Sequence, residues 1–169
     1  RFEKQIYVSK NSKVDVFVPF PIEIGIFVIN DDGKSSLLDC FTCEPIHSRF
    51  GLYGTPDHGH LCMYAKIPIR KHRESFIFAL TKISITNNTD SGQLVGRVVF
   101  PVTGHNMYYV ENSTEAHIDD LSMIIESDLG KIVARVSKVN YDPKSNWITA
   151  PSVATRDEFK EFLMDRGIE

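Results

Sequence analysis

The segment from residue 40 to residue 62 gathers most of the side chains that could bind a metal ion. It contains all three cysteines and three of the six histidines of the chain. Zinc takes about four nitrogen and sulfur ligands in a tetrahedron, and the spacing Cys-x2-Cys-x3-His, which starts at Cys40, is compatible with such a site. Three later residues would share one face of an extended chain: His58, His60 and Cys62.

The same segment also permits a structural interpretation. If residues 36–43 form a strand, Cys40 and Cys43 point to opposite faces and cannot bind one ion without a bend. Free cysteine is among the most buried residue types and packs as a small apolar side chain. Residues 44–60 are rich in glycine and proline, which favours a long loop, and such loops are often functional. The sequence therefore leaves open both zinc binding and core packing.

A second metal hypothesis involves iron. The pair His58-x-His60, followed by His105, is similar to the histidine spacing of cupin oxygenases, which fold as jelly rolls. Three histidines can hold non-haem iron, so a metal-dependent oxygenase is one alternative function. The glutamate that cupins usually carry soon after the His-x-His pair is absent from this sequence.

The composition indicates an ordinary globular domain. A length of 169 residues predicts a single domain, and the start at Arg1 leads us to expect that it was cut from a longer protein. The net charge of −3 gives no general field for nucleic acid, DNA included, and no apolar run approaches the ~20 residues of a membrane span. The odd number of cysteines favours a reducing, intracellular compartment.

One compact basic run could form a local patch for nucleic acid. Arg70, Lys71 and Arg73 lie together in the sequence, and such side chains contact phosphate groups. The competing interpretation is a solvated loop, because runs of charge usually face water. The sequence therefore predicts these three residues as the nucleic-acid contacts if the protein binds RNA.

Two acidic pairs and the single tryptophan have structural explanations. The pair Asp31-Asp32 fits a turn, and the pair Asp119-Asp120 fits the electrostatics at the start of a helix. Trp147 lies in a predicted loop, where it is either an exposed anchor or a cover for the core. No phosphate-binding loop, Rossmann fingerprint or Gly-x-Ser-x-Gly motif occurs.

Hydrophobic periodicity predicts many strands and two helices. The predicted strands cover residues 6–9, 14–20, 22–29, 36–43, 61–69, 94–102 and 131–139. The predicted helices cover residues 113–130 and 155–167, while residues 74–86 fit either type. The first helix has one apolar stripe, formed by Ile118, Leu121, Ile125 and Leu129.

This order of elements favours an α/β or mixed α+β domain, because early strands are followed by a helix between two late strands. The alternative is a β-sandwich or jelly roll with a C-terminal helix. Residues 22–29 and 36–43 are expected to pair as a hairpin, since the Asp-Gly step between them is a strong turn signal.

Residues 18–54 read VPFPIEIGIFVINDDGKSSLLDCFTCEPIHSRFGLYG, and the sequence continues to YAKIPI. This stretch resembles the start of the Maelstrom domain, and the similarity covers roughly residues 18–70, more thinly the rest. The shared features are a Glu-Ile-Gly strand end, a turn glycine, a proline, an Arg-x-Gly step and an Ile-Pro pair. They lie at Glu23, Gly33, Pro45, Arg49 and Pro68.

The resemblance implies an RNase-H-like mixed sheet with flanking helices, related to DEDD-type exonucleases but without their full carboxylate set. It implies a non-catalytic or weakly catalytic module of piRNA-type small-RNA silencing in the germline, in cytoplasmic granules or the nucleus. Its partners would be single-stranded RNA or a protein of the silencing complex, and any enzymatic activity would be cleavage of single-stranded RNA.

The resemblance also implies a zinc site. That family uses a glutamate of the first strand, which Glu23 matches, and a later Cys/His/Cys group, although this chain has no cysteine after Cys62. The expected zinc ligands are Glu23, His58, His60 and Cys62. The first alternative function is a C2-like β-sandwich that binds proteins, and the second is the iron enzyme with His58, His60 and His105.

Overall fold

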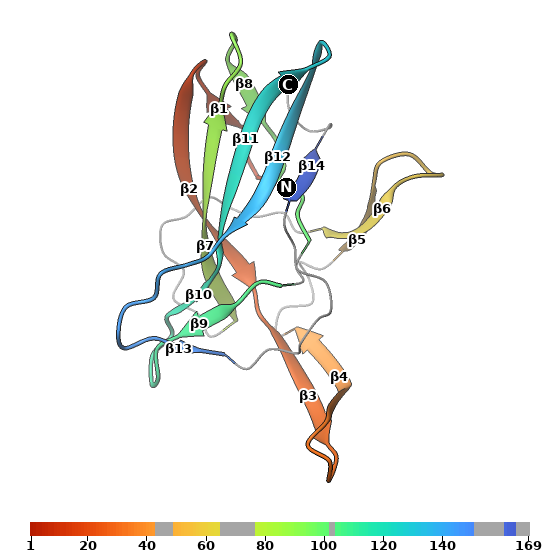
Figure 1. Ribbon diagram of the computed structural model, residues 1–169, viewed down its shortest axis with the longest axis vertical. Helices are drawn as coiled ribbons and strands as arrows, with labels where there is room; N and C mark the ends of the chain where they lie inside the picture. Colours follow the sequence, from red (N-terminus) through yellow and green to blue (C-terminus); the bar gives the residue numbers. More distant parts are fainter. Residues whose placement is uncertain (43–48, 65–76, 102–103, 151–160, 165–169) are drawn as a thin grey trace.

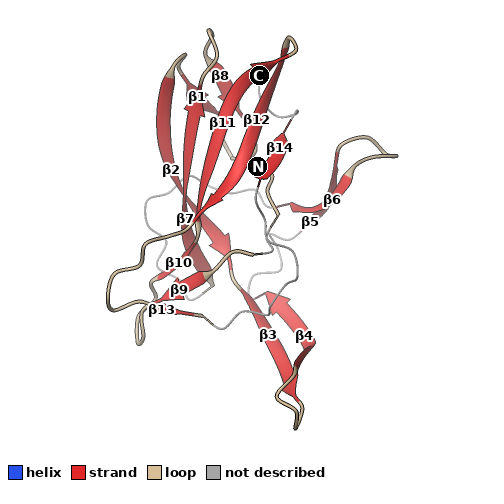
Figure 2. Ribbon diagram, in the orientation of Figure 1, coloured by secondary structure: helices blue, strands red, loops and turns tan. Residues whose placement is uncertain are grey.

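The protein is an all-β structure in the part of the chain that the computed structural model describes, which comprises residues 1–42, 49–64, 77–101, 104–150 and 161–164. These residues form fourteen strands and no helix (Figure 2). The first seven strands are β1 (Ile6–Val8), β2 (Ser12–Pro21), β3 (Glu23–Ile29), β4 (Ser35–Thr42), β5 (Arg49–Tyr53), β6 (His60–Tyr64) and β7 (Phe78–Asn87). The others are β8 (Gln93–Val95), β9 (Met107–Tyr109), β10 (Ala116–Ile118), β11 (Asp120–Asp128), β12 (Lys131–Val139), β13 (Ile148–Thr149) and β14 (Glu161–Met164).

The largest sheet has eight strands and is centred on β7. β7 pairs antiparallel with β2 on one side, and on the other side it pairs parallel with β10 and β11 in succession. Beyond β11 the sheet continues through β12 to β14, and beyond β10 it continues through β9 to β13. The sheet therefore splits into two branches at Asp119, the single residue between β10 and β11 (Figure 1).

The core lies on one face of this sheet, where β1 and β8 form a small second layer. Alternate side chains of β11 point into it, among them Leu121, Met123 and Ile125, which are fully buried. Val8 of β1 and Val95 of β8 belong to the same cluster. Each such buried side chain stabilises the fold by roughly 1.5–3 kcal/mol, so this layer contact accounts for much of the packing free energy.

The predicted α/β fold is wrong, because the segment that was expected to form its main helix is extended. Residues 113–130 contain β10 and β11, and Gly130 makes a hairpin turn to β12 instead of a helix stop. The apolar stripe satisfied helical spacing, but Leu121, Met123 and Ile125 also alternate with period two, and burial follows that alternation. An RNase-H-like sheet flanked by helices is therefore excluded for the described residues.

The predicted C-terminal helix is wrong where it can be compared. Residues 161–164 form β14, which pairs antiparallel with β12, while the rest of the range 155–167 lies outside the described residues. The β-sandwich alternative named an all-β class but included this same helix. The described ranges also contain no helix long and apolar enough to span a membrane.

Several individual strands are confirmed. The predicted strands 6–9, 14–20 and 131–139 correspond to β1, β2 and β12, and the hairpin of 22–29 with 36–43 is formed by β3 and β4. The ambiguous range 74–86 is a strand where it is described, as part of β7. The predicted strand 94–102 is much shorter, because β8 ends at Val95.

Candidate functional site

The β3–β4 hairpin projects from the rest of the molecule and is the most distinctive surface of the fold (Figure 1). We call residues 23–42 the arm, and the other described residues the body. At the base of the arm, the Ile22 amide donates to the Ile77 carbonyl at 2.9 Å. At its tip, the Asn30 amide donates to the Lys34 carbonyl at 2.9 Å, and Gly33 takes a φ of 77° that closes the turn.

The arm exposes large apolar side chains along its whole length. Eight of them are between 38% and 72% exposed: Ile24, Ile26, Phe27, Val28, Ile29, Leu37, Leu38 and Phe41. None of the eight belongs to the core cluster of the body. Successive residues of a strand point to opposite faces, so both faces of the arm are apolar. Contiguous exposed apolar surface of this kind marks interaction sites.

The arm is a two-stranded sheet with a β-bulge in β4 and none in β3. Within the described residues, β3 and β4 hydrogen-bond to each other and to no third strand. Ile26 pairs with Asp39 and Phe27 with Leu37, so Leu38 is an extra, bulged residue of β4. A bulge disturbs the hydrogen-bonding edge of its own strand, so β3 keeps the more regular edge.

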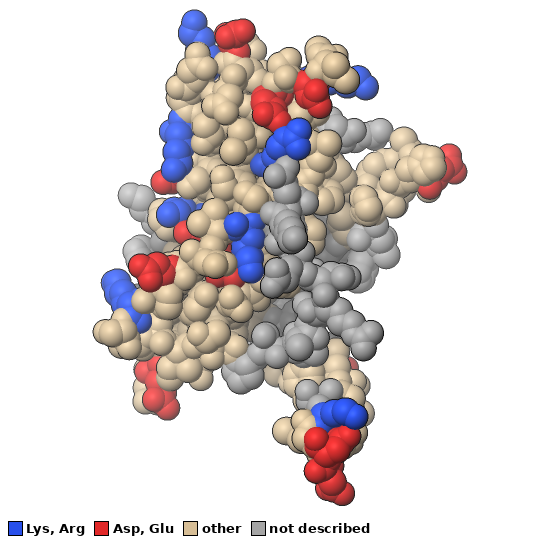
Figure 3. All heavy atoms as spheres, viewed as in Figure 1, with Lys and Arg blue, Asp and Glu red and all other residues tan. Residues whose placement is uncertain are grey.

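The tip of the arm is charged and exposed. Figure 3 shows acidic and basic side chains gathered at this end. The Lys34 ammonium lies 3.2 Å from Oδ2 of Asp32, and the Lys34 amide donates to Oδ1 of the same carboxylate at 3.2 Å. Asp31 and Asp32 thus occupy a turn, as the sequence predicted. The apolar surface therefore lies along the sides of the arm, and its end is charged.

The residues predicted to bind metal are distributed over separate elements. Glu23 begins β3 in the arm, whereas His60 and Cys62 lie on β6, and His58 lies in the turn that joins β5 to β6. Cys62 packs against the core, and His60 is exposed. Among the described residues, no three His, Cys, Asp or Glu side chains are grouped so that they could hold a metal ion. His58, His60 and Cys62 share the β5–β6 hairpin, but the described residues do not group them as a metal site.

Other predicted site residues fall elsewhere. His105 lies before β9 near the branch point of the main sheet, and the described residues do not group it with His58 and His60. Arg70, Lys71 and Arg73 lie outside the described residues, as does Cys43. The RNA patch and the Cys40–Cys43 part of the metal hypothesis therefore remain predictions.

A second polar cluster lies at the branch point of the main sheet. Asp119 is fully buried, and its Oδ2 accepts from the Asn106 amide at 2.8 Å. Its Oδ1 accepts from the Tyr141 amide at 3.0 Å and from the Tyr108 hydroxyl at 3.2 Å. The Lys138 ammonium lies 3.8 Å from Oδ2. One carboxylate therefore connects the segments that flank the two branches. The prediction that Asp119 lies at the start of a helix is wrong.

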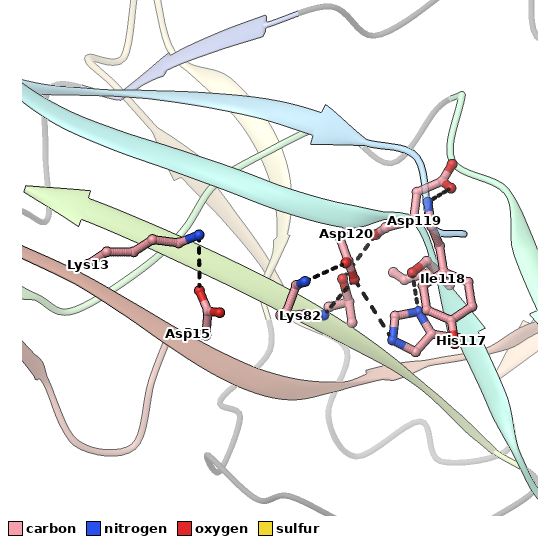
Figure 4. A network of polar contacts seen from close by, with 9 residues as sticks. Lys13, Asp15, Lys82, His117, Ile118, Asp119 and Asp120 are labelled. Atoms are coloured by element: carbon pink, nitrogen blue, oxygen red, sulfur yellow. Dashed lines mark hydrogen bonds and ion pairs between the residues drawn. The ribbon is translucent and has the colours of Figure 1, made fainter. Parts of the chain in front are cut away.

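His117 and Asp120 extend this cluster on the neighbouring strands (Figure 4). The His117 ring stacks on Tyr141 with ring centroids 3.9 Å apart, and Trp147 meets Tyr141 edge-on at 5.6 Å. Nδ1 of His117 lies 2.6 Å from the Ile118 carbonyl oxygen, and Nε2 lies 3.8 Å from Oδ1 of Asp120. Trp147 therefore covers the edge of the body, and both ring nitrogens of His117 face protein groups.

Burial keeps the titratable rings of this cluster neutral. It lowers the pKa of His105 and His117 below the ordinary value of 6.5, and it raises the pKa of Tyr108 and Tyr141 above 10.0. Both Asp119 oxygens accept hydrogen bonds, and Nδ1 of the neutral His117 ring donates to the Ile118 carbonyl, so the cluster is engaged mainly in structural hydrogen bonds. It stabilises the branched sheet, which leaves the arm as the candidate functional surface.

The sequence predicted the β3–β4 hairpin but not that it projects from the body. The signal was available in IEIGIFVI and SLLDCF, which are almost continuously apolar instead of alternating. Such runs usually mark strands that are covered on both faces. In the structure these strands project away from the body, so the cover that the sequence predicts is not supplied by the described residues.

The comparisons with known proteins correct the family prediction. Neither a curated protein nor a solved structure matches the chain. The Maelstrom resemblance is wrong, because a different family model matches almost the whole length and the described fold lacks RNase-H helices. The predicted role in small-RNA silencing rested on that resemblance and has no other support. The chain belongs to the family described as "Protein of unknown function (DUF432)", whose model matches residues 1–165.

Proposed function

We propose that this chain is a protein-binding domain and that the arm is its docking surface. The observation that carries the proposal is the row of eight exposed apolar side chains of the hairpin, none of which belongs to the core cluster of the described residues. Their exposed surface is on the order of 700 Å², close to the ~800 Å² that each partner contributes to a standard protein interface. The arm therefore has enough apolar surface for a stable complex.

A protein fits the arm better than a lipid bilayer does. A hairpin that enters a bilayer leads with apolar residues, whereas the tip of the arm carries Asp31 and Asp32. Anionic headgroups would repel this end. The apolar residues lie along both sides of the hairpin, where another protein can pack against them.

Site-specific photo-crosslinking tests the proposal. A photoreactive phenylalanine at Leu38, which is 69% exposed in the arm, should form a reproducible adduct with a protein in the cells of origin. The matched control is the same group at Leu129, the exposed leucine of the β11–β12 turn, where no adduct is expected. The absence of protein adducts from the arm, or co-flotation of the chain with phosphatidylcholine–phosphatidylglycerol vesicles in place of them, would overturn the proposal.

A further inference from the structure

The structure points to the identity of the partner: we propose that a second copy of this chain covers the arm, in a symmetric dimer. The inference rests on the docking role of the arm proposed above. The two arms lie side by side in opposite directions, and each one shields apolar side chains of the other. The interface is formed by the exposed apolar residues on one face of β3 and β4.

The arm is a structure that requires a cover to be stable. An isolated two-stranded hairpin is marginally stable in water, and it needs a third strand or a packed face to persist. Within the described residues the arm has neither, because β3 and β4 pair only with each other and their apolar side chains lie outside the core cluster. Judged by the described residues, the arm thus needs a cover. A second copy is the partner that is always present in equal amount.

The exposed surface of the arm suits a symmetric contact. Each arm offers on the order of 700 Å² divided between its two faces, so a partner arm on one face would cover roughly half of it on each subunit. Closed two-fold dimers use the same patch on both subunits, so the patch must be complementary to itself. The apolar side chains of the arm satisfy this condition, because apolar packing does not require opposite charges on the two sides.

The charges at the tip determine how two arms can be oriented. Asp31 and Asp32 make the end of each arm acidic, with Lys34 paired to Asp32. Two arms that ran in the same direction would bring these acidic tips together, and like charges at short distance repel. Opposite directions place the two tips at opposite ends of the interface. The regular edge of β3, from Glu23 to Ile29, is compatible with antiparallel association in this direction.

The oligomeric state of the purified full chain tests the inference. Light scattering after size exclusion should give a dimer for the wild type and a monomer for the double variant Ile26→Thr, Leu38→Thr. Threonine keeps strand propensity while it removes the exposed apolar groups. The matched control, Leu129→Asn, removes an exposed leucine from another hairpin and should remain dimeric. Leu38→Lys provides a second route to the monomer if the double variant does not fold, as checked by circular dichroism.

The photo-crosslinking experiment separates this inference from the proposed function. With tagged and untagged chains mixed, a group at Leu38 should join a tagged chain to an untagged one. An adduct with a different protein, together with a monomeric wild type, would overturn the inference that the partner is a second copy. The proposed docking role of the arm would still stand. A dimer that persists in the arm variants would also overturn the inference, because the interface would then lie elsewhere.

Discussion

At the scale of single residues, Leu129 combines two features that leucine rarely shows together. Its φ is 48°, in the left-handed region, and its side chain is 99% exposed. It shares the two-residue turn between β11 and β12 with Gly130, whose φ is 79°. Two positive φ values in succession define the tight hairpin turn that suits the twist of paired strands, and this turn favours Asn-Gly. Leu129 therefore destabilises its own turn.

Replacement of Leu129 by asparagine should stabilise the protein. The left-handed backbone costs an ordinary residue about 1–2 kcal/mol, and asparagine relieves part of this cost. The exposed side chain of Leu129 contributes no packing that could be lost. We expect the free energy of unfolding to rise by about 1 kcal/mol in a urea titration. Leu129→Val is the control, since a β-branched residue should make the same turn worse, and equal stability of the two variants would contradict this explanation.

At the scale of elements, the break between β10 and β11 determines the shape of the main sheet. β10 pairs with β7 through His117 and Leu80, and β11, which begins at Asp120, resumes the pairing with β7 at Leu121, opposite Ile83. The buried Asp119 between them accepts hydrogen bonds from both sides of the split. A buried carboxylate that loses its hydrogen-bond partners destabilises the fold. The hydrogen bonds of Asp119 therefore fix the position at which the two branches separate.

Asp119→Asn should therefore destabilise the fold strongly. An amide at this position replaces one accepting oxygen by a donor, which leaves an amide N–H unsatisfied and the Lys138 ammonium without its carboxylate. We expect a loss of about 3 kcal/mol in the free energy of unfolding. The control is Asp15→Asn, which breaks the exposed pair with Lys13 and should cost less than about 0.5 kcal/mol. Similar losses for both variants would refute the role assigned to Asp119.

The same elements show what periodicity can predict. The β3–β4 hairpin and strand β12 could be predicted, because Asp32-Gly33 marks a turn and the sequence of β12 is rich in β-branched residues. Strand β11 could not be predicted, since Leu121 and Ile125 satisfy the spacing of a helix as well as that of a strand. What decides between them is the pairing with β7, which lies about forty residues earlier in the sequence. Local pattern carries no information about that long-range contact.

At the scale of the whole molecule, the body and the arm differ in how they are held together. The central strands of the body are hydrogen-bonded on two sides and contribute to a common core. The arm is bonded to the body at its base and is otherwise a separate two-stranded sheet. The sequence could predict the hairpin, but not that it projects, because projection depends on where the pairing of β2 with β7 ends, at Pro21 and Phe78.

This division predicts two classes of amide hydrogen exchange. Amides of β7 and β11 should exchange through global unfolding, since they lie at the centre of the largest sheet. Amides of β3 and β4 should exchange through a local opening of lower free energy in dilute protein, because their side chains are exposed and no third strand covers them in the described structure. Mass spectrometry of peptides from residues 23–42 measures this difference directly.

The β11–β12 hairpin is the internal control, because it has the same two-strand topology but packs on the core. Its protection should equal that of β7 at every chain concentration. Protection of the arm should rise with chain concentration, since mass action fills the interface between copies and closes the local opening. An arm as protected as β7 in the most dilute sample would contradict the division, because the arm would then unfold only together with the body.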